Sequence, residues 1–522
     1  MLPDVLLSAT PSSPADDDRD FDAENTPATG NPPLETTSAR GTLISVTPPS
    51  REAPESSAYT LCLTRADGGT LRLLFADNIR IAEAQDGGIS VYHSDTGKTT
   101  RYSSRGERSE VDGDATTDDA DLALVNITDS AVRVGDRNTL IFNFADNATI
   151  SGGTGHTRIL LADGVAGNTI RINGNAVITG AALRQSAITL DGASNRVRFS
   201  DIQGCTLSLG DGGTEFEATL VRDTDITLGD GSNTLHLYAL RGEGRLSLGH
   251  GDNRISIYEL KDNAAVRAGD GHNSIDMDEV AGDAVLRAGH GCNTIHVYQL
   301  RDNARVVVGD GDNGITLYEA EDSAALRVGN GNNTIRLYEI EDHASVIAGN
   351  GHNSVQADTL RQYASIRCGH GANALCVRHM RNSATLEAGE GNNLAQVLAM
   401  WDTSALSLGS GDNFGFIGAR HAKAAGRAVG GMLHVQRKRP DEQTLLLLFR
   451  TLIRRHGNRI RAGLPTAPAT PRDSHFPYVA PPRWRTPVMA GLGPSPCPAN
   501  DASSPNPCGP PFSQEEQGPG DA

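Results

Sequence analysis

The sequence predicts an all-β protein built as a parallel β-solenoid, and three observations lead to this prediction. A unit of about twenty residues repeats from Gly229 to Asn413, as in GDGDNGITLYEAEDSAALRV followed by GNGNNTIRLYEIEDHASVIA. Within each unit, apolar residues alternate with polar ones at the strand period. Every unit also contains a Gly-x-Gly turn signal. A fixed period of this length indicates stacked units, none of which buries its apolar face alone.

The apolar columns of the repeat assign the strands. Ala264 and Val266 stand before the glycine pair on even numbers, whereas Ile275 and Met277 stand after it on odd numbers. The chain must therefore turn at the glycines. A further column that includes Leu260 returns to even numbers, which requires a second corner. Each unit is thus predicted to be one coil with two main strands and room for a short third.

A column of asparagines follows the glycine pair. Its parity matches the buried residues of the second strand, so we expect an inward ladder of amides that bond the turn backbone and the next coil. The column consists of Asn233, Asn253, Asn273, Asn293, Asn313, Asn333, Asn353, Asn373, Asn393 and Asn413.

The segments before the repeat differ in composition. Residues 1–55 are rich in Ser, Thr, Pro and acidic residues and are predicted to be disordered. Residues 56–105 alternate with Asp-Gly-Gly turns and predict a small β-meander that covers the first edge of the solenoid, or else an independent domain. Residues 106–121 are predicted to be an acidic linker, because a helix-loop-helix calcium loop needs Gly at its sixth place and Glu at its twelfth, and Thr117 and Ala123 stand there instead.

The solenoid is predicted to span residues 122–420, with irregular coils before the regular ones at 229–413. Residues 421–463 form a basic segment in which Leu445, Leu448, Phe449 and Leu452 share one face of a helix. This helix is expected to plug the last coil. Alternatively it binds an anionic membrane or a partner through Arg450, Arg454, Arg455 and Arg459. Residues 464–522 are Pro- and Gly-rich and predict a disordered tail.

Composition excludes several classes of function. A net charge of -18 argues against a nucleic-acid binder. The 7 cysteines form no CxxC pair, and no run of eighteen apolar residues predicts a membrane-spanning helix. The chain also lacks a nucleophile elbow, a phosphate-binding GxxxxGK and an HExxH motif.

The turn from Gly329 to Ile335, Gly-Asn-Gly-Asn-Asn-Thr-Ile, resembles the glycine-rich nonapeptide GGxGxDxUx of the RTX, or haemolysin-type calcium-binding, family. The resemblance implies calcium held between turns, and an exported toxin, adhesin or enzyme. Here Asn stands at the family's Asp position, and the period is twenty. Calcium prefers charged oxygen ligands, so a neutral amide makes a weak site.

Two exposed columns offer other sites. The residue between the two glycines reads Asp230, His250, Asp270, His290 and Asp310 in successive coils, a pattern that could hold zinc or simply be hydrated. An outward column of tyrosines lies beside glutamates. These rings and carboxylates suit a sugar ligand, although they also suit a ladder that only stabilises the sheet. The candidate residues are Tyr238, Tyr258, Tyr298, Tyr318 and Tyr338 with Glu259, Glu319 and Glu339.

The sequence therefore favours a non-catalytic β-solenoid that acts as a binding, adhesin-like or effector-like scaffold, with a polysaccharide or host cell-surface ligand. We expect a bacterial, virulence-associated protein, secreted or on the cell surface, by a route without a classical signal peptide; a cytoplasmic location stays open. The alternative is a carbohydrate-active β-helix enzyme, a lyase or hydrolase that uses the Tyr/Glu face.

Overall fold

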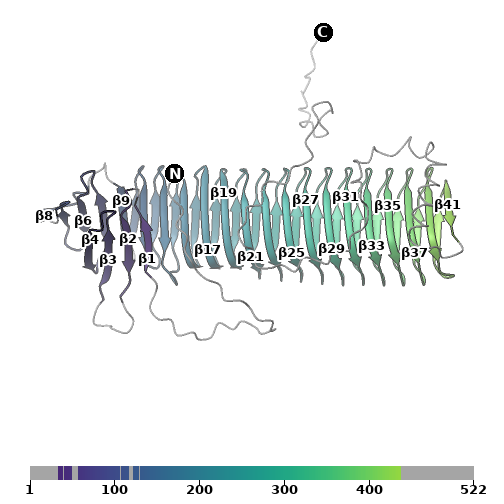
Figure 1. The fold of residues 1–522 in the computed structure, drawn as a ribbon, viewed down its shortest axis with the longest axis horizontal. Helices are drawn as coiled ribbons and strands as arrows, with labels where there is room; N and C mark the ends of the chain where they lie inside the picture. The colour runs from purple at the N-terminus through teal and green to yellow at the C-terminus, as the bar shows by residue number, and fades with distance from the viewer. Residues whose placement is uncertain are drawn as a thin grey trace, which may run out of the picture.

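The structure is a computed structural model, and it describes residues 33–38, 40–49, 57–105, 107–116, 121–128 and 130–436 of the 522-residue chain. Its described part is all β, without a helix. The long parallel β-solenoid that the repeat predicts forms a straight rod, with the N-terminal strands gathered at one end (Figure 1).

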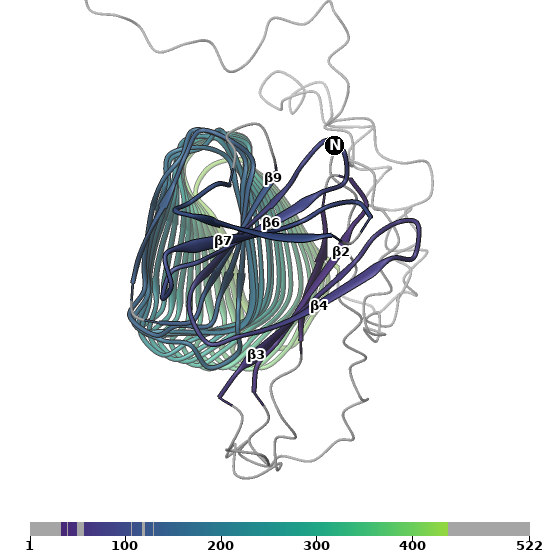
Figure 2. The same ribbon diagram turned by 90° about the vertical axis from the view of Figure 1, so that its left-hand side faces the viewer.

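Each coil contributes one strand to each of two parallel sheets. The broad sheet contains the longer strand of every coil, and the narrow sheet contains a four-residue strand of every coil. The narrow sheet has 16 strands. Viewed along the rod, the coils superimpose into one outline with two facing walls (Figure 2).

The broad-sheet strands are β9 (Asp121–Asn126), β11 (Thr139–Asn143), β13 (Thr157–Leu161), β15 (Ala176–Arg184), β17 (Ser194–Gln203), β19 (Gly213–Arg222), β21 (Thr234–Arg241), β23 (Arg254–Leu260), β25 (Ser274–Val280), β27 (Thr294–Leu300), β29 (Gly314–Ala320), β31 (Thr334–Ile340), β33 (Ser354–Leu360), β35 (Ala374–Met380), β37 (Leu394–Met400), β39 (Phe414–Arg420) and β41 (Met432–Val435). The narrow-sheet strands are β10 (Ala131–Val134), β12 (Thr149–Gly152), β14 (Thr169–Ile172), β16 (Ala187–Leu190), β18 (Thr206–Leu209), β20 (Asp225–Leu228), β22 (Arg245–Leu248), β24 (Ala265–Ala268), β26 (Val285–Ala288), β28 (Arg305–Val308), β30 (Ala325–Val328), β32 (Ser345–Ala348), β34 (Ser365–Cys368), β36 (Thr385–Ala388), β38 (Ala405–Leu408) and β40 (Ala425–Ala428).

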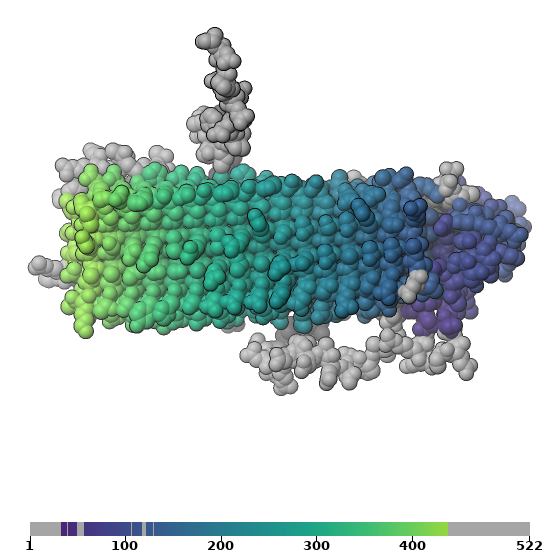
Figure 3. All heavy atoms as spheres, turned by 180° about the vertical axis from the view of Figure 1, so that it is seen from behind, coloured from purple at the N-terminus to yellow at the C-terminus, as the bar shows by residue number. Residues whose placement is uncertain are grey.

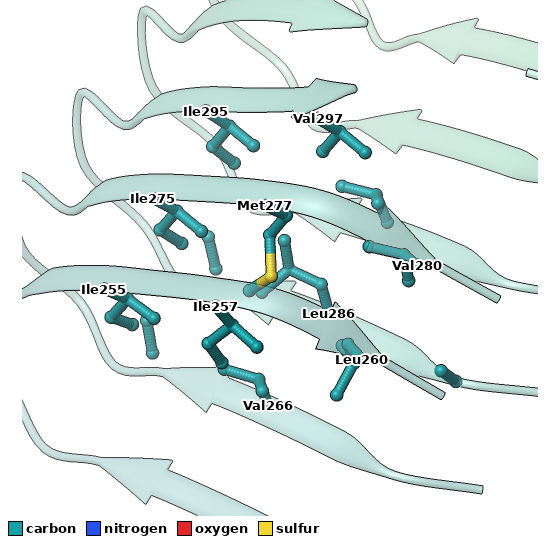
Figure 4. Packing of buried hydrophobic residues seen from close by; sticks show 14 of the residues in the cluster. Ile255, Ile257, Leu260, Val266, Ile275, Met277, Val280, Leu286, Ile295 and Val297 are labelled. Atoms are coloured by element: carbon teal, nitrogen blue, oxygen red, sulfur yellow. The ribbon is translucent and has the colours of Figure 1, made fainter. Parts of the chain in front are cut away.

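The register places equivalent residues of successive coils directly beside one another. Ile255 pairs with Ile275, and Ile275 pairs with Ile295. These side chains point into the space between the sheets, where Val266 and Leu286 from the narrow sheet meet them (Figure 4). One continuous apolar core results, because identical side chains repeat at the spacing of neighbouring strands, about 4.8 Å.

The second corner of the coil is a bend inside one strand, which corrects the expectation of a short third strand. In β23, Ile257 and Leu260 face the core while Tyr258 and Glu259 between them both point outward. The ladder of residue pairs skips Tyr258. Two consecutive outward residues shift the parity as a β-bulge does. The tyrosine and glutamate columns therefore lie side by side on the outer face.

The N-terminal strands form two structures. The cap consists of β5 (Ile79–Glu83), β6 (Ile89–His93), β7 (Lys98–Tyr102) and β8 (Arg108–Asp112). Strand β5 pairs antiparallel with β9, so the cap covers the first edge of the broad sheet. The side sheet consists of β1 (Leu34–Thr37), β2 (Leu43–Thr47), β3 (Tyr59–Thr64) and β4 (Thr70–Phe75). It lies beside the rod, and its Leu61 and Leu63 join a cluster with Phe142 on the outer face of the broad sheet (Figure 2).

Several predicted boundaries differ from the observed ones. Strands β1 and β2 fall within residues 1–55, for which disorder was the expectation, because Ile44 and Val46 find buried partners in β3. Strand β8 falls within the predicted linker at 106–121. The solenoid also continues past residue 420, through β40 and β41. The predicted helix in 421–463 and the predicted tail at 464–522 lie outside the described residues.

Candidate functional site

The asparagine column lies inside the coil. Its ten members are almost fully buried. The side-chain Nδ2 of every member but the last donates to Oδ1 of the asparagine in the next coil at 2.8–3.0 Å, and Nδ2 of the last member, Asn413, donates to backbone carbonyl oxygens such as that of Val429 at 3.2 Å. Asn313 Nδ2 also donates to the carbonyl oxygens of Gly309 and Gly311, and Asn313 Oδ1 accepts the backbone N–H of Asn293 at 3.0 Å. The column ties each turn to its own backbone and to the next coil.

This arrangement does not fit the calcium site that the RTX resemblance implies. The amide oxygen of Asn313 accepts two N–H groups from the preceding coil. The carbonyl oxygens of Gly309 and Gly311 accept the amide of Asn313. The oxygens that would face the ion already accept hydrogen bonds, and no carboxylate stands among them.

The side chains of the exposed column between the glycines accept hydrogen bonds from the backbone of the neighbouring coil. Each side chain accepts the backbone N–H at the same position of the following coil, at 2.6–3.3 Å, through Asp230, His250, Asp270, His290 and Asp310. The Nδ1 atoms of both histidines serve as acceptors. The metal-binding interpretation of this column gains no support, because one side chain per coil does not gather a set of ligands.

Within the described ranges, three potential metal ligands meet in the cap, at Asp77, His93 and Asp95. Nδ1 of His93 is 3.3 Å from Oδ1 of Asp77, and Oδ2 of Asp77 accepts the backbone N–H of Asp95 at 3.3 Å. The carboxylate of Asp77 thus orders the turn that follows β6. These contacts explain the cluster without an ion.

A second ladder of side chains lies at the other corner of the coil, in the turn between each broad-sheet strand and the narrow-sheet strand that follows it. Asp262, Asp302, Asp322 and Asp342 have φ between 53° and 63°, the left-handed region. Their carboxylates accept backbone N–H groups of the preceding coil, as in Gly282 to Asp302 at 2.8 Å. Sequence reasoning missed this column, although its Asp, Asn and Gly composition is the usual signal for positive φ.

The tyrosine column forms two stacks on the outer face of the broad sheet. Tyr238 and Tyr258 lie 4.8 Å apart between ring centroids, and Tyr318 lies 5.4 Å from Tyr298 and 4.6 Å from Tyr338. Neighbouring rings cover part of one another's faces, and Tyr238 and Tyr338 remain 50% and 39% exposed. The columns offer a row of phenol groups along the rod.

Basic residues neutralise the glutamates beside these rings. Glu259 pairs with Arg241 and with Lys261, the latter at 3.3 Å. Burial tends to raise the pKa of Glu259, but the hydrogen bond from Arg241 and the charge of Lys261 outweigh burial and lower it. Glu279, almost fully buried, pairs with Lys261 at 2.7 Å and with Arg301. Such paired carboxylates stabilise the sheet and are poor general acids.

The remaining glutamates of the column also have hydrogen-bond or ion-pair partners. Gln299 donates to Glu319 at 2.9 Å, and Arg361 lies 3.2 Å from Glu339. The column of tyrosines and glutamates is therefore a continuous network of stacked rings, amides and ion pairs.

The tyrosine ladder is interrupted once, at Asp278 in β25. This carboxylate occupies the tyrosine position between Tyr258 and Tyr298, and Asp276 lies two residues before it on the same face. Burial and the nearby negative charge of Asp276 raise the pKa of Asp278. A hydrogen bond from Tyr258 lowers it, but does not offset the rise. The sequence already contains this break, which is visible once the repeats are aligned.

A cleft of about 1000 Å³ lies between the side sheet and the outer face of the broad sheet. The side sheet contributes Thr36, Thr37 and Thr42, and strands β13 to β21 contribute the opposite wall. That wall includes Arg158, Thr179, Arg196, Arg198, Glu215 and Thr234. No sequence signal revealed the cleft, because its two walls are distant in the chain.

The lining of the cleft is mostly apolar, with residues such as Ile44, Leu63 and Ile81, and charged and hydroxyl groups are set into it. Arg196 pairs with Glu215 at 2.5 Å, and Arg198 pairs with Glu217 at 2.6 Å. Arg158 is partly buried, its Nε has no hydrogen-bond partner, and burial lowers its pKa. The hydroxyl group of Thr36 is buried and unpartnered as well. The cleft thus keeps hydrogen-bonding capacity for a polar ligand.

The four C-terminal arginines proposed for membrane or partner binding lie outside the described residues. Among the residues that are described, no helix is long and apolar enough to cross a membrane.

Comparisons with known proteins identify no relative. No family model, no curated protein and no solved structure matches the chain. The class that the chain defines is therefore its fold, a parallel β-solenoid with coils of about twenty residues. Membership of the RTX family is not shown.

Proposed function

We propose that this protein is a non-catalytic binding module that holds an extended polysaccharide along the outer face of its broad sheet. One observation supports this most directly: the cleft and the tyrosine stacks share one sheet face and meet at β21. This strand contributes Thr234 to the cleft and Tyr238 to the first stack. A chain bound in the cleft can continue along the rod without leaving the surface.

The periodicity of the face suits a ligand that is itself a repeating chain. Chemically similar groups recur about every 4.8 Å along the axis, the spacing of neighbouring strands. Figure 3 shows one long side of the rod, on which side chains stand in rows parallel to the axis. Many weak, equivalent contacts give avidity when a polymer engages several of them together.

The place of action is part of the same proposal. A rigid rod with a repeating face fits an exported or surface-located scaffold, adhesin-like or effector-like, that contacts cell-surface glycans. Export, a bacterial source and a role in virulence remain expectations from the sequence.

Affinity electrophoresis and calorimetry with three probes test the binding function: polygalacturonate, heparin and dextran, which are carboxylated, sulfated and neutral polymers. Arg158→Ala in the cleft and Tyr318→Ala in the stack should each weaken binding about tenfold, the loss of one good polar or stacking contact. Arg327→Ala, an exposed change on the outer face of the narrow sheet, is the matched control. Absence of binding to all three polymers, or equal loss in the control, contradicts the proposal.

A second candidate is a carbohydrate-active enzyme, and the break at Asp278 favours it. Two carboxyl groups, Asp276 and Asp278, stand on the outer face beside aromatic rings, and burial raises the pKa of Asp278, which suits a general acid. Release of reducing ends or unsaturated sugars from the same polymers tests it. Activity lost in Asp278→Asn but kept in Glu319→Gln supports an enzyme, whereas binding without turnover supports the module.

A further inference from the structure

The charged residues of the cleft include one arginine without a counter-ion. Arg196 and Arg198 form ion pairs with Glu215 and Glu217, which lie one coil further along the rod. Arg158, on β13, lines the same cleft. Within the ranges that the structure describes, its guanidinium group has no ion pair and no hydrogen bond. The positive charge of Arg158 is therefore uncompensated.

The other carboxylate that lines the cleft, Glu83, does not supply the missing counter-charge. It accepts hydrogen bonds from Ser38 Oγ at 2.9 Å and from Thr42 Oγ1 at 2.7 Å. Burial lowers the pKa of Arg158, and no described carboxylate lies near enough to raise it. Glu83 thus ties the side sheet to the cap and leaves Arg158 without a partner.

The strand register explains why Arg158 has no counter-ion. Its neighbours in the outward column of the broad sheet are Leu140 of β11 and Val177 of β15. The next outward residue on its own strand is Leu160, which belongs to the apolar cluster between the side sheet and the broad sheet. The paired arginines of β17, by contrast, stand beside glutamates of β19. Apolar side chains therefore surround Arg158 on three sides.

A guanidinium group in such surroundings is unfavourable, because no opposite charge offsets its desolvation. Arg158 is partly buried, and its Nε atom is inaccessible and unpartnered. Polar groups left unsatisfied in this way are expected where a ligand supplies the partner. The terminal N–H groups of a guanidinium form a planar fork that binds a carboxylate or a tetrahedral oxyanion through two hydrogen bonds. Arg158 is thus suited to an anionic group within the cleft.

The opposite wall of the cleft adds groups that suit a sugar ring. Thr36 of β1 is 1% exposed and lines the cleft, and its hydroxyl group has no hydrogen-bond partner among the described residues. Ile44 of β2 and Leu63 of β3 line the cleft as well. A sugar carries hydroxyl groups at its edge and C–H groups on its faces, so it matches a mostly apolar lining with a few placed polar groups.

We propose that the cleft binds an acidic sugar whose carboxylate or sulfate group pairs with Arg158. This inference rests on the proposed polysaccharide binding and narrows the ligand to an anionic polymer. The chain as a whole carries a net charge of -18 and repels such a polymer at long range. Selectivity for the acid therefore has to come from a short-range contact, which Arg158 provides.

The position of Arg158 allows its contribution to be measured apart from that of the tyrosine stacks. Arg158 lies on β13 and Tyr318 lies on β29, eight broad-sheet strands further along the rod. At the strand spacing this separation is about 38 Å. A trisaccharide is too short to contact both residues. Trisaccharides therefore report on the cleft, whereas polymers report on the whole face.

The experiment measures by calorimetry the affinity of the intact 522-residue chain for two pairs of probes. The first pair is trigalacturonate and its methyl ester, and the second pair is sulfated maltotriose and maltotriose. The protein should bind the acidic member of one pair at least about tenfold more tightly than the neutral member, the effect of one charged hydrogen-bonded pair. A preference within the first pair identifies a carboxylate, and a preference within the second identifies a sulfate.

Arg158→Met should abolish this preference and change the affinity for the neutral member less than about twofold. Arg171→Met is the matched control, because it removes the same charge from β14, on the exposed outer face of the narrow sheet. It should leave the preference unchanged. Since Arg158→Met removes an uncompensated charge, it should also raise the midpoint of thermal unfolding of the free protein, by about 2 °C.

Three results overturn the inference. They are equal affinity for the acidic and neutral members of both pairs, a preference that survives Arg158→Met, and a lower midpoint of thermal unfolding in Arg158→Met, which indicates a structural contact of the arginine. In each case, polymer binding that is weakened by Tyr318→Ala still supports the proposed polysaccharide binding. If neither the polymers nor the trisaccharides bind, the proposed function fails and this inference fails with it.

Discussion

Replacement of Asn313 by alanine tests whether the inward amide ladder holds the coils together. The substitution removes the acceptor of the Asn293 backbone N–H, which lies at 3.0 Å in a buried site. It also removes the donor to the carbonyl oxygens of Gly309 and Gly311. One orphaned buried N–H costs about 1–3 kcal/mol. With the two carbonyl groups only partly rehydrated, the expected loss of stability is about 2–4 kcal/mol.

The loss should be local as well as global, because stability in a repeat protein is carried by interfaces between neighbouring units. Chemical denaturation gives the free energy of unfolding, and hydrogen exchange followed by mass spectrometry gives the position. Faster exchange is expected at the turns around Asn293 and Asn313. Distant coils such as the one that contains Asn233 should keep their protection.

Asn330→Ala is the matched control. Asn330 lies in the same turn region, but it is exposed, and its side chain accepts the backbone N–H of Asn350 at 2.9 Å. Water can replace that bond, so the cost should stay near about 0.5 kcal/mol. Equal destabilisation by Asn313→Ala and Asn330→Ala would show that burial of the amide does not matter, and the reasoning would fail.

Three further predictions follow from single contacts, each measured by thermal or chemical unfolding. Gly331→Ala should destabilise the rod by more than about 2 kcal/mol, because the new Cβ would lie 2.2 Å from a carbonyl oxygen of the preceding coil; Gly314→Ala, with open space around it, should be neutral or stabilising. Asp322→Val should cost about 1–2 kcal/mol, since a β-branched residue resists the observed φ of 55°, and a tolerated valine contradicts this. The pKa of Glu259 is lowered from its ordinary value of 4.5, so its stabilisation is present above pH 4.5 and fades as the pH falls below it. The pKa of Asp278 is raised from 3.8, so its ionisation reduces the stability of the protein as the pH rises above 3.8. At neutral pH, Asp278→Asn should therefore stabilise the protein, whereas Glu259→Gln should destabilise it. The same sign of change in both variants would refute the assigned environments.

The candidate site illustrates how far local patterns reach. The tyrosines could be stacked into one column and the glutamates into another from their spacing, because a parallel register stacks residues one period apart. The bend at Tyr258 brings the two columns side by side on the outer face. The ion pairs that the glutamates form could not be predicted from the spacing. Whether Glu259 is free or neutralised depends on Arg241 from the coil before it and Lys261 beside it, and side-chain length and direction decide that contact.

The sequence by itself determined the solenoid, its period, its inward asparagines and the turn at the glycines, because each of these depends on residues within one coil or exactly one coil apart. Tertiary structure alone decided the strands at Leu34–Thr37 and Leu43–Thr47, the bend at Tyr258 and the cleft. The cleft forms where the side sheet, seated on Phe142, faces Arg158 and the strands after it. Its walls are far apart in the chain, and no periodic pattern records how two such surfaces pack.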